Sequence, residues 1–147
     1  MPIIPKPLRL ADDSIIFVVE GDEVIRSALH FILDDQNETY SFEYLDHALA
    51  DAAARTPSVV LLGIDAVLHD GERTLADIAS RLPGTRILIV ANSESDPLAI
   101  ACLKWGAHGV LGKPITFDSV RRKVDDLLMR HERSTAMLGL LPLSAAW

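Results

Sequence analysis

Short runs of consecutive apolar residues alternate with amphipathic segments along most of this chain. The runs cover residues 15–19, 59–62, 87–90 and 109–111, with a weaker one at 40–44. Continuous aliphatic runs of this length are typical of strands buried on both faces of a sheet. The segments between them repeat apolar residues every three or four positions, which predicts helices. Five strands alternating with five helices indicate an α/β domain whose parallel sheet is covered on both sides.

Polar residues and prolines mark where these helices should begin and end. Asp22 is a suitable N-cap for the first helix, and Asp46 for an alanine-rich helix running through Arg55. Asp96-Pro97 opens a fourth helix that ends at Gly106. The residues expected to face the core are Ile25, Leu29, Ile32 and Leu33 in the first helix, Leu75, Ile78, Ala79 and Leu82 in the third, and Phe117, Val120, Val124, Leu127 and Leu128 in the last.

Composition and charge narrow the class of protein. The 147 residues suit one compact domain, and 49% hydrophobic with 24% charged residues is a globular composition. A net charge of -7 argues against a nucleic-acid or anionic membrane surface. The single cysteine, Cys102, has apolar neighbours and is expected to be a small buried hydrophobe in a reducing cytoplasm. We expect an N-terminal extension at 1–13, one domain at 14–132, an apolar tail at 133–147, and no signal peptide or membrane helix.

The chemistry of such a domain is expected at one edge of its sheet. Parallel α/β sheets place their functional groups where the strands end. The residues predicted there are Glu20, Gly21 and Asp22 after the first strand, Gly63 and Asp65 after the third, Ala91 and Asn92 after the fourth, and Lys113 after the fifth. The scattered histidines show no ligand spacing.

Several of these features, in this order, resemble the receiver domain of bacterial response regulators. They are the acidic turn after 15–19, Gly63 followed by Asp70-Gly71, then Gly106-Ala107, then Lys113-Pro114. The resemblance extends from about Ser14 to Arg130. It implies a flavodoxin-like (βα)5 fold with strand order 2-1-3-4-5. It also implies a cis bond between Lys113 and Pro114.

In that family, the resemblance implies five chemical positions. Two acidic residues hold magnesium, an aspartate accepts a phosphoryl group, a Ser or Thr and a lysine contact that group, and an aromatic residue responds to it. Here these positions read Glu20-Gly21, Gly63, Ala91, Lys113 and Val110, so only the lysine is unchanged. Glycine cannot supply the nucleophilic carboxylate. We therefore expect no cofactor and no metal site, with Glu20 and Asp22 as weak candidate ligands only.

Two residues keep an alternative interpretation. Lys113 is either a relic that still binds an anion or, as we favour, a structural lysine paired with Glu20 or Asp22. Asp65 is either a displaced phosphoacceptor or, as we favour, a carboxylate that caps or solvates its loop.

We therefore predict a phosphorylation-independent receiver that acts as a protein-interaction module in bacterial signalling, and not an enzyme. The alternative is a stand-alone phosphoacceptor that uses Asp65. A flavin-binding flavodoxin-like protein is disfavoured because Glu20 and Asp22 would repel a phosphate. The expected partner is a histidine kinase, a regulator or a second copy in a homodimer, with no nucleic acid and no membrane.

The interface is expected near the end of the fourth helix. Trp105 would form its centre, with Arg121 and Arg122 of the last helix beside it. The alternative is that Trp105 packs on its own core. Residues 134–147 carry no charged side chain and are predicted to be a binding segment or an additional packed helix.

Overall fold

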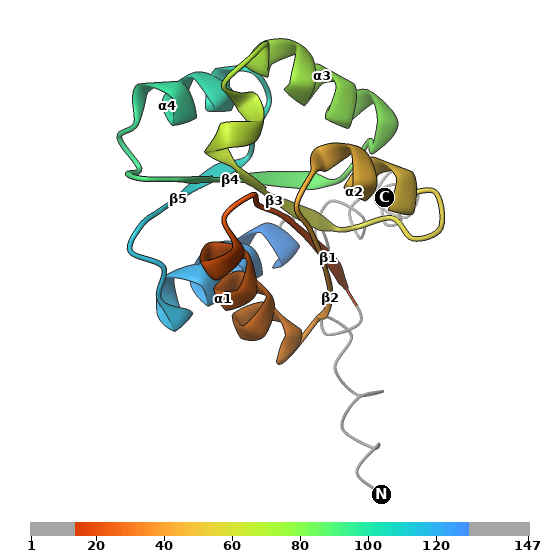
Figure 1. The fold of residues 1–147 in the computed structure, drawn as a ribbon, viewed down its shortest axis with the longest axis vertical. Helices are drawn as coiled ribbons and strands as arrows, with labels where there is room; N and C mark the ends of the chain where they lie inside the picture. The colour runs from red at the N-terminus through yellow and green to blue at the C-terminus, as the bar shows by residue number, and fades with distance from the viewer. Residues whose placement is uncertain (1–13, 130–147) are drawn as a thin grey trace, which may run out of the picture.

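The computed structural model describes residues 14–129, which form a five-stranded sheet with helices on both faces (Figure 1). The strands are β1 (Ile15–Val19), β2 (Glu38–Phe42), β3 (Val59–Gly63), β4 (Arg86–Ala91) and β5 (Gly109–Gly112). All neighbouring strands pair in parallel, in the order β2-β1-β3-β4-β5. The predicted fold class and strand order are therefore confirmed.

The helices divide between the two faces of this sheet. In chain order they are α1 (Glu23–Asp34), α2 (Leu45–Asp51), the short 3-10 helix η3 (Ile64–Val67), α3 (Gly71–Arg81) and α4 (Pro97–Lys104). A further helix covers residues 117–129. Figure 1 shows α2, α3 and α4 on one face, and α1 with helix 117–129 on the other.

Each face of the sheet has its own apolar core because side chains alternate along a strand. Phe17 and Val19 pack with α2, α3 and α4, whereas Ile16 and Val18 pack with α1 and helix 117–129. The aliphatic residues of β3 and β4 are buried on both sides. This two-sided burial is the physical reason why these strands appear in the sequence as unbroken apolar runs.

Some helix predictions are wrong in detail. Tyr44, and not Asp46, is the N-cap of α2, and this helix ends at Asp51 instead of Arg55. The helix α4 ends at Lys104, two residues before Gly106. Ala79 is exposed. Phe117 is 51% exposed and is not part of the core on which helix 117–129 packs. Helical periodicity predicts which residues share one face of a helix, but not whether the first turn of that face is covered.

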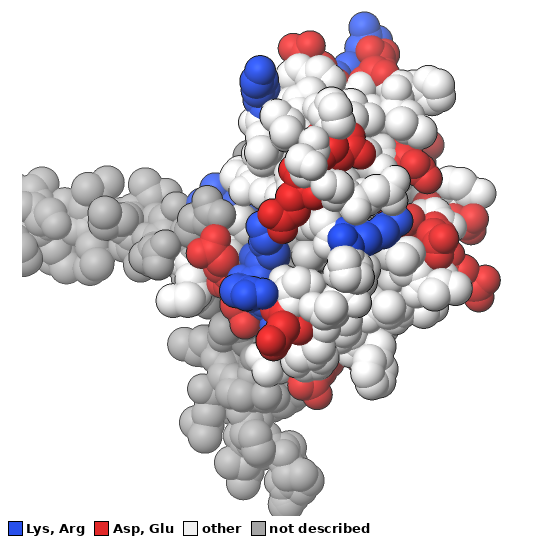
Figure 2. Space-filling model, turned by 90° about the vertical axis from the view of Figure 1, so that its left-hand side faces the viewer, with Lys and Arg blue, Asp and Glu red and all other residues white. Residues whose placement is uncertain are grey.

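The expected extension 1–13 and tail 133–147 lie outside the described residues. Within residues 14–129, no helix is both long and apolar enough to cross a membrane. Figure 2 shows acidic and basic side chains interspersed on the viewed face, without one continuous basic patch.

Candidate functional site at the carboxyl edge of the sheet

The side chain of Glu20 occupies the space above Gly63. A Cβ atom added to Gly63 would lie 2.6 Å from Oε1 of Glu20 and 3.0 Å from its Cδ. Glu20 is only 7% exposed, so its carboxylate has little room to move away. The position at the end of β3 therefore holds a carboxylate that belongs to the end of β1.

Two hydrogen bonds, one to its carboxylate and one to its backbone oxygen, fix Glu20 in this place. The amide of Asp22 donates to Oε2 of Glu20 at 3.0 Å. The guanidinium of Arg26 donates to the backbone oxygen of Glu20 at 2.7 Å. Asp22 itself caps α1, because its Oδ1 accepts a hydrogen bond from the amide of Ile25 at 3.0 Å. The predicted capping role of Asp22 is confirmed. Gly21 is exposed and lies between two residues whose carboxylates each accept a hydrogen bond from a backbone amide.

Lys113 pairs with neither of its predicted partners. Its Nζ donates to Oδ1 of Asn92 at 3.2 Å, and its side chain is exposed. Its backbone amide donates to the oxygen of Ala91, and the bond to Pro114 is cis, as the family resemblance implied. Ala91 is fully buried. The Lys113 side chain is thus bonded to an amide oxygen just after β4, and not to a carboxylate of the turn that follows β1.

Asp65 lies in the first turn of η3 and is exposed. It lines a cavity of about 440 Å³ together with Gly21 and Gly63. The charged residues among the described side chains that line this cavity are Glu43, Asp46 and Asp65, all acidic. Such a lining repels a phosphoryl group instead of attracting it.

The residues at this edge do not fit a magnesium ion. Magnesium requires near-octahedral oxygen ligands that converge on one point. Glu20 already accepts from a backbone amide, and Asp22 is used as a helix cap. Among residues 14–129, no three His, Cys, Asp or Glu side chains are grouped so that they could hold a metal ion.

Trp105 packs across the first turn of α3. A Cβ atom on Gly71 would lie 2.9 Å from Cζ3 of Trp105, so any larger residue there would force the indole to shift. Trp105 is partly buried and contacts the core beneath α3 and α4. This contact is the packing role that the sequence left as an alternative to an interface. The remaining exposed part of the ring stays available at the surface.

Arg121 does not face solvent as an interface residue should. It is 8% exposed and donates to Oδ1 of Asn37 at 2.9 Å and to Oε1 of Gln36 at 3.2 Å. It also forms an ion pair with Asp125 at 2.6 Å. Arg121 therefore holds helix 117–129 against the turn between α1 and β2, whereas Arg122 is exposed.

Cys102 is fully buried in the core on the α4 side, and burial, with a smaller effect of Asp96, raises the pKa of its thiol. A buried thiol that holds its proton is a poor nucleophile. This placement agrees with the structural role predicted from its apolar neighbours.

A doubly wound sheet of this order, with its polar groups at the strand ends, defines a flavodoxin-like protein of the receiver type. Comparison with known proteins specifies the family. The model of the response regulator receiver domain matches residues 16–125, so the chain belongs to that family.

Curated relatives are longer than this chain. The KDP operon transcriptional regulatory protein KdpE of Escherichia coli is 29% identical over 130 residues, which are 88% of this chain and 57% of KdpE. The transcriptional regulatory protein ZraR of Salmonella typhimurium is 31% identical over 121 residues, 82% of this chain and 27% of ZraR. The chain thus spans about a quarter to just over half the length of these relatives.

Solved structures agree with the family. The receiver domain of NtrX from Brucella abortus superposes with a TM-score of 0.69 at 26% identity, covering 78% of this chain and 98% of that domain. A CheY-like receiver domain protein from Methanospirillum hungatei gives a TM-score of 0.73 at 20% identity, covering 83% and 98%. At that identity the second likeness supports the fold alone.

Sequence reasoning identified the positions at this edge but not their contacts. It did not predict that Glu20 would fill the space at Gly63. The signal for this contact is a long acidic residue and a glycine at the ends of neighbouring strands, because the long side chain can occupy the volume that glycine leaves empty. It also missed Arg26, which holds the β1–α1 turn, and the polar contacts of Arg121.

Proposed function

We propose that this chain is a phosphorylation-independent receiver that works by binding another protein in bacterial signal transduction, without catalysis of its own. The observation that carries the proposal is the carboxylate of Glu20 above Gly63. An acceptor aspartate is absent from that position in the sequence, and a buried side chain already fills the volume that it would use.

The other residues at the edge support the same proposal. Ala91 offers no hydroxyl, and Lys113 is engaged with Asn92. The cavity beside Gly63 is lined by acidic groups and by none of opposite charge among the described residues. Phosphoryl transfer needs a nucleophilic carboxylate at the acceptor position, and magnesium binding needs several converging oxygen ligands. The described residues at this edge offer neither.

A binding role requires a surface. The exposed side chains of Ile100 and Leu103 on α4 and the outer part of Trp105 are the surface we assign to a partner or a second copy, and we propose that the exposed Arg122 of helix 117–129 also contributes. Large apolar and aromatic side chains together with arginine suit a protein interface. The curated relatives KdpE and ZraR are named as transcriptional regulators. A signalling protein is therefore the appropriate class of partner, and contact with nucleic acid by this domain is not proposed.

Incubation with acetyl phosphate and magnesium, followed by intact-mass spectrometry, tests the phosphorylation part of the proposal. The expected result is an unchanged mass, in contrast to a receiver with aspartate at the acceptor position treated in parallel. A gain of one phosphoryl group would overturn the proposal. If that gain disappears in Asp65→Ala but persists in Asp70→Ala, the displaced acceptor at Asp65 is the correct function.

A further inference from the structure

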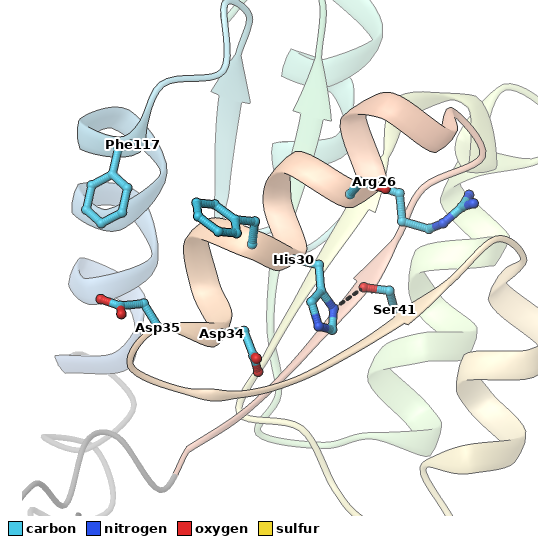
Figure 3. A pocket seen from close by; sticks show the side chains of 8 residues that line it. Arg26, His30, Asp34, Asp35, Ser41 and Phe117 are labelled. Atoms are coloured by element: carbon cyan, nitrogen blue, oxygen red, sulfur yellow. Dashed lines mark hydrogen bonds between the residues drawn. The ribbon is translucent and has the colours of Figure 1, made fainter.

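A groove lies on the opposite face of the sheet from the cavity at Asp65. It has a volume of about 590 Å³ and runs between α1, β2 and the first turn of helix 117–129. Its described lining is Arg26, Ser27, His30, Phe31, Asp34, Asp35, Ser41 and Phe117. Figure 3 shows the hydrogen bond between Nδ1 of His30 and Oγ of Ser41, at 2.6 Å, at the base of this lining.

Two aromatic side chains make this groove unusual for a surface exposed to water. Phe31 is 78% exposed and Phe117 is 51% exposed, and they come from different helices. Figure 3 shows Phe117 on the last helix, and Asp34 and Asp35 at the C-terminal end of α1. Exposed aromatic residues that converge on one groove indicate a surface that another segment covers.

The chain itself contains a segment of matching chemistry. Residues 134–147 read STAMLGLLPLSAAW, with leucines, a methionine and Trp147 and without any charged side chain. This segment lies outside the described residues. Such an apolar sequence gains free energy when its side chains leave water.

The segment is attached at a suitable place. It follows helix 117–129, whose first residue, Phe117, lines the groove. The way back from residue 129 to residue 117 is about 18 Å, at 1.5 Å of rise per helical residue. The linker 130–133 with the first two residues of the segment spans up to about 20 Å when extended. Residues 136–147 are therefore able to reach Phe117 and α1.

Charges favour the same arrangement. Asp34 and Asp35 lie on the rim of the groove, and neither carboxylate has an ion-pair partner within residues 14–129. Between the last helix and the apolar segment stand Arg130 and Arg133, which outnumber the single Glu132 there. A basic linker that passes an acidic rim is attracted to it.

We propose that residues 134–147 fold back along helix 117–129 and cover the groove of Phe31 and Phe117 in the same molecule. The segment then acts as an internal ligand that occupies a binding surface until a competing partner displaces it. Because the linker is short, its effective concentration at the groove is high. This proposal does not depend on whether the chain accepts a phosphoryl group.

The full chain labelled with 5-fluorotryptophan provides the test. Its two tryptophans give two fluorine resonances, and Trp147→Phe identifies the one from the segment. The exposure of Trp147 is then measured by relaxation from a soluble gadolinium chelate. We expect Trp147 to be protected several-fold relative to the denatured chain, and this protection to be lost in Phe31→Ser/Phe117→Ser.

A matched control and a dilution series complete the experiment. Leu68→Ser changes a side chain of similar exposure, 57%, after η3, and should leave the protection of Trp147 unchanged. The Trp105 resonance reports whether each variant keeps its fold. Protection that survives in Phe31→Ser/Phe117→Ser, or that is absent from the unmodified chain, overturns the proposal. Protection that disappears on dilution also overturns it, because a second copy then supplies the segment.

Discussion

Substituting aspartate for Gly63 restores the residue that receivers use at the end of β3, and the structure predicts that this chain resists it. The new Cβ would lie 2.6 Å from Oε1 of Glu20, so the buried carboxylate must be displaced from its hydrogen bond with the amide of Asp22. Overpacking of this kind costs about 1–3 kcal/mol. A lost hydrogen bond to a charged group adds roughly 1.5–3 kcal/mol.

Repulsion between the two carboxylates increases this cost. Two like charges 4 Å apart repel by roughly 4 kcal/mol at an effective dielectric of 20, the typical value near a protein surface. Partial relaxation reduces each contribution, so Gly63→Asp is expected to lower the free energy of unfolding by about 2–5 kcal/mol, near the top of the range for single substitutions. Gly63→Ala keeps only the steric part, about 1–3 kcal/mol.

Urea unfolding followed by circular dichroism measures these differences, and a double-mutant cycle assigns their cause. In a Glu20→Ala background the same Gly63→Asp substitution should cost less than about 1 kcal/mol, so the coupling energy should be at least about 1 kcal/mol. Gly21→Asp is the matched control, because a Cβ there meets no atom within 4 Å. It should change stability by less than about 0.5 kcal/mol. An equal cost of Gly63→Asp with and without Glu20 would refute the reasoning.

Three further predictions concern other parts of the fold. Arg121→Ala should lower the free energy of unfolding, measured with urea, by about 2–4 kcal/mol, because it removes the guanidinium that donates to Asn37 and Gln36. Arg122→Ala, at the exposed neighbouring position, should cost less than about 0.5 kcal/mol. Equal effects of the two substitutions would contradict the role assigned to Arg121. Cys102 should react with a thiol reagent only as fast as the protein unfolds, and fast labelling of the native protein would disprove its burial. Because the pKa of this thiol is raised in the folded state, the free energy of unfolding should fall as the pH rises through the ordinary thiol pKa. Leu103→Ser combined with Arg122→Ala should weaken self-association about tenfold in sedimentation experiments without a change in melting temperature, and unchanged association would remove the α4 surface from the proposed interface.

The sequence predicted the fold well because burial on both faces leaves a direct record in it. The runs at β1, β3 and β4 are unbroken, Asp22 caps α1 as predicted, and α4 begins at Pro97 as predicted, with Asp96 as its N-cap. Helix ends were predicted less well. Phe117 fits the apolar period of its helix, yet its side chain is half exposed and is not part of the core.

The site was predicted as a set of positions and not as a set of contacts. Which residues stand at the strand ends follows from the order of elements, but where a long side chain points depends on the space left by its neighbours. Lys113 has the carboxylates of Glu20 and Asp22 as plausible partners in the sequence, whereas its hydrogen bond is to Asn92, the residue that follows β4. Arg121 appears as one of three consecutive basic residues, and only the packing of helix 117–129 separates the buried one from the exposed one.

The contact between Glu20 and Gly63 also has a consequence for the history of such a chain. An exchange of glycine for aspartate at this position would be a simple single substitution if nothing in the fold opposed it. Here that exchange would place a side chain where a buried carboxylate already lies. A chain that acquired aspartate at position 63 would have to alter Glu20 before, or together with, Gly63. Positions 20 and 63 are therefore expected to change together among sequences derived from this one, or not at all.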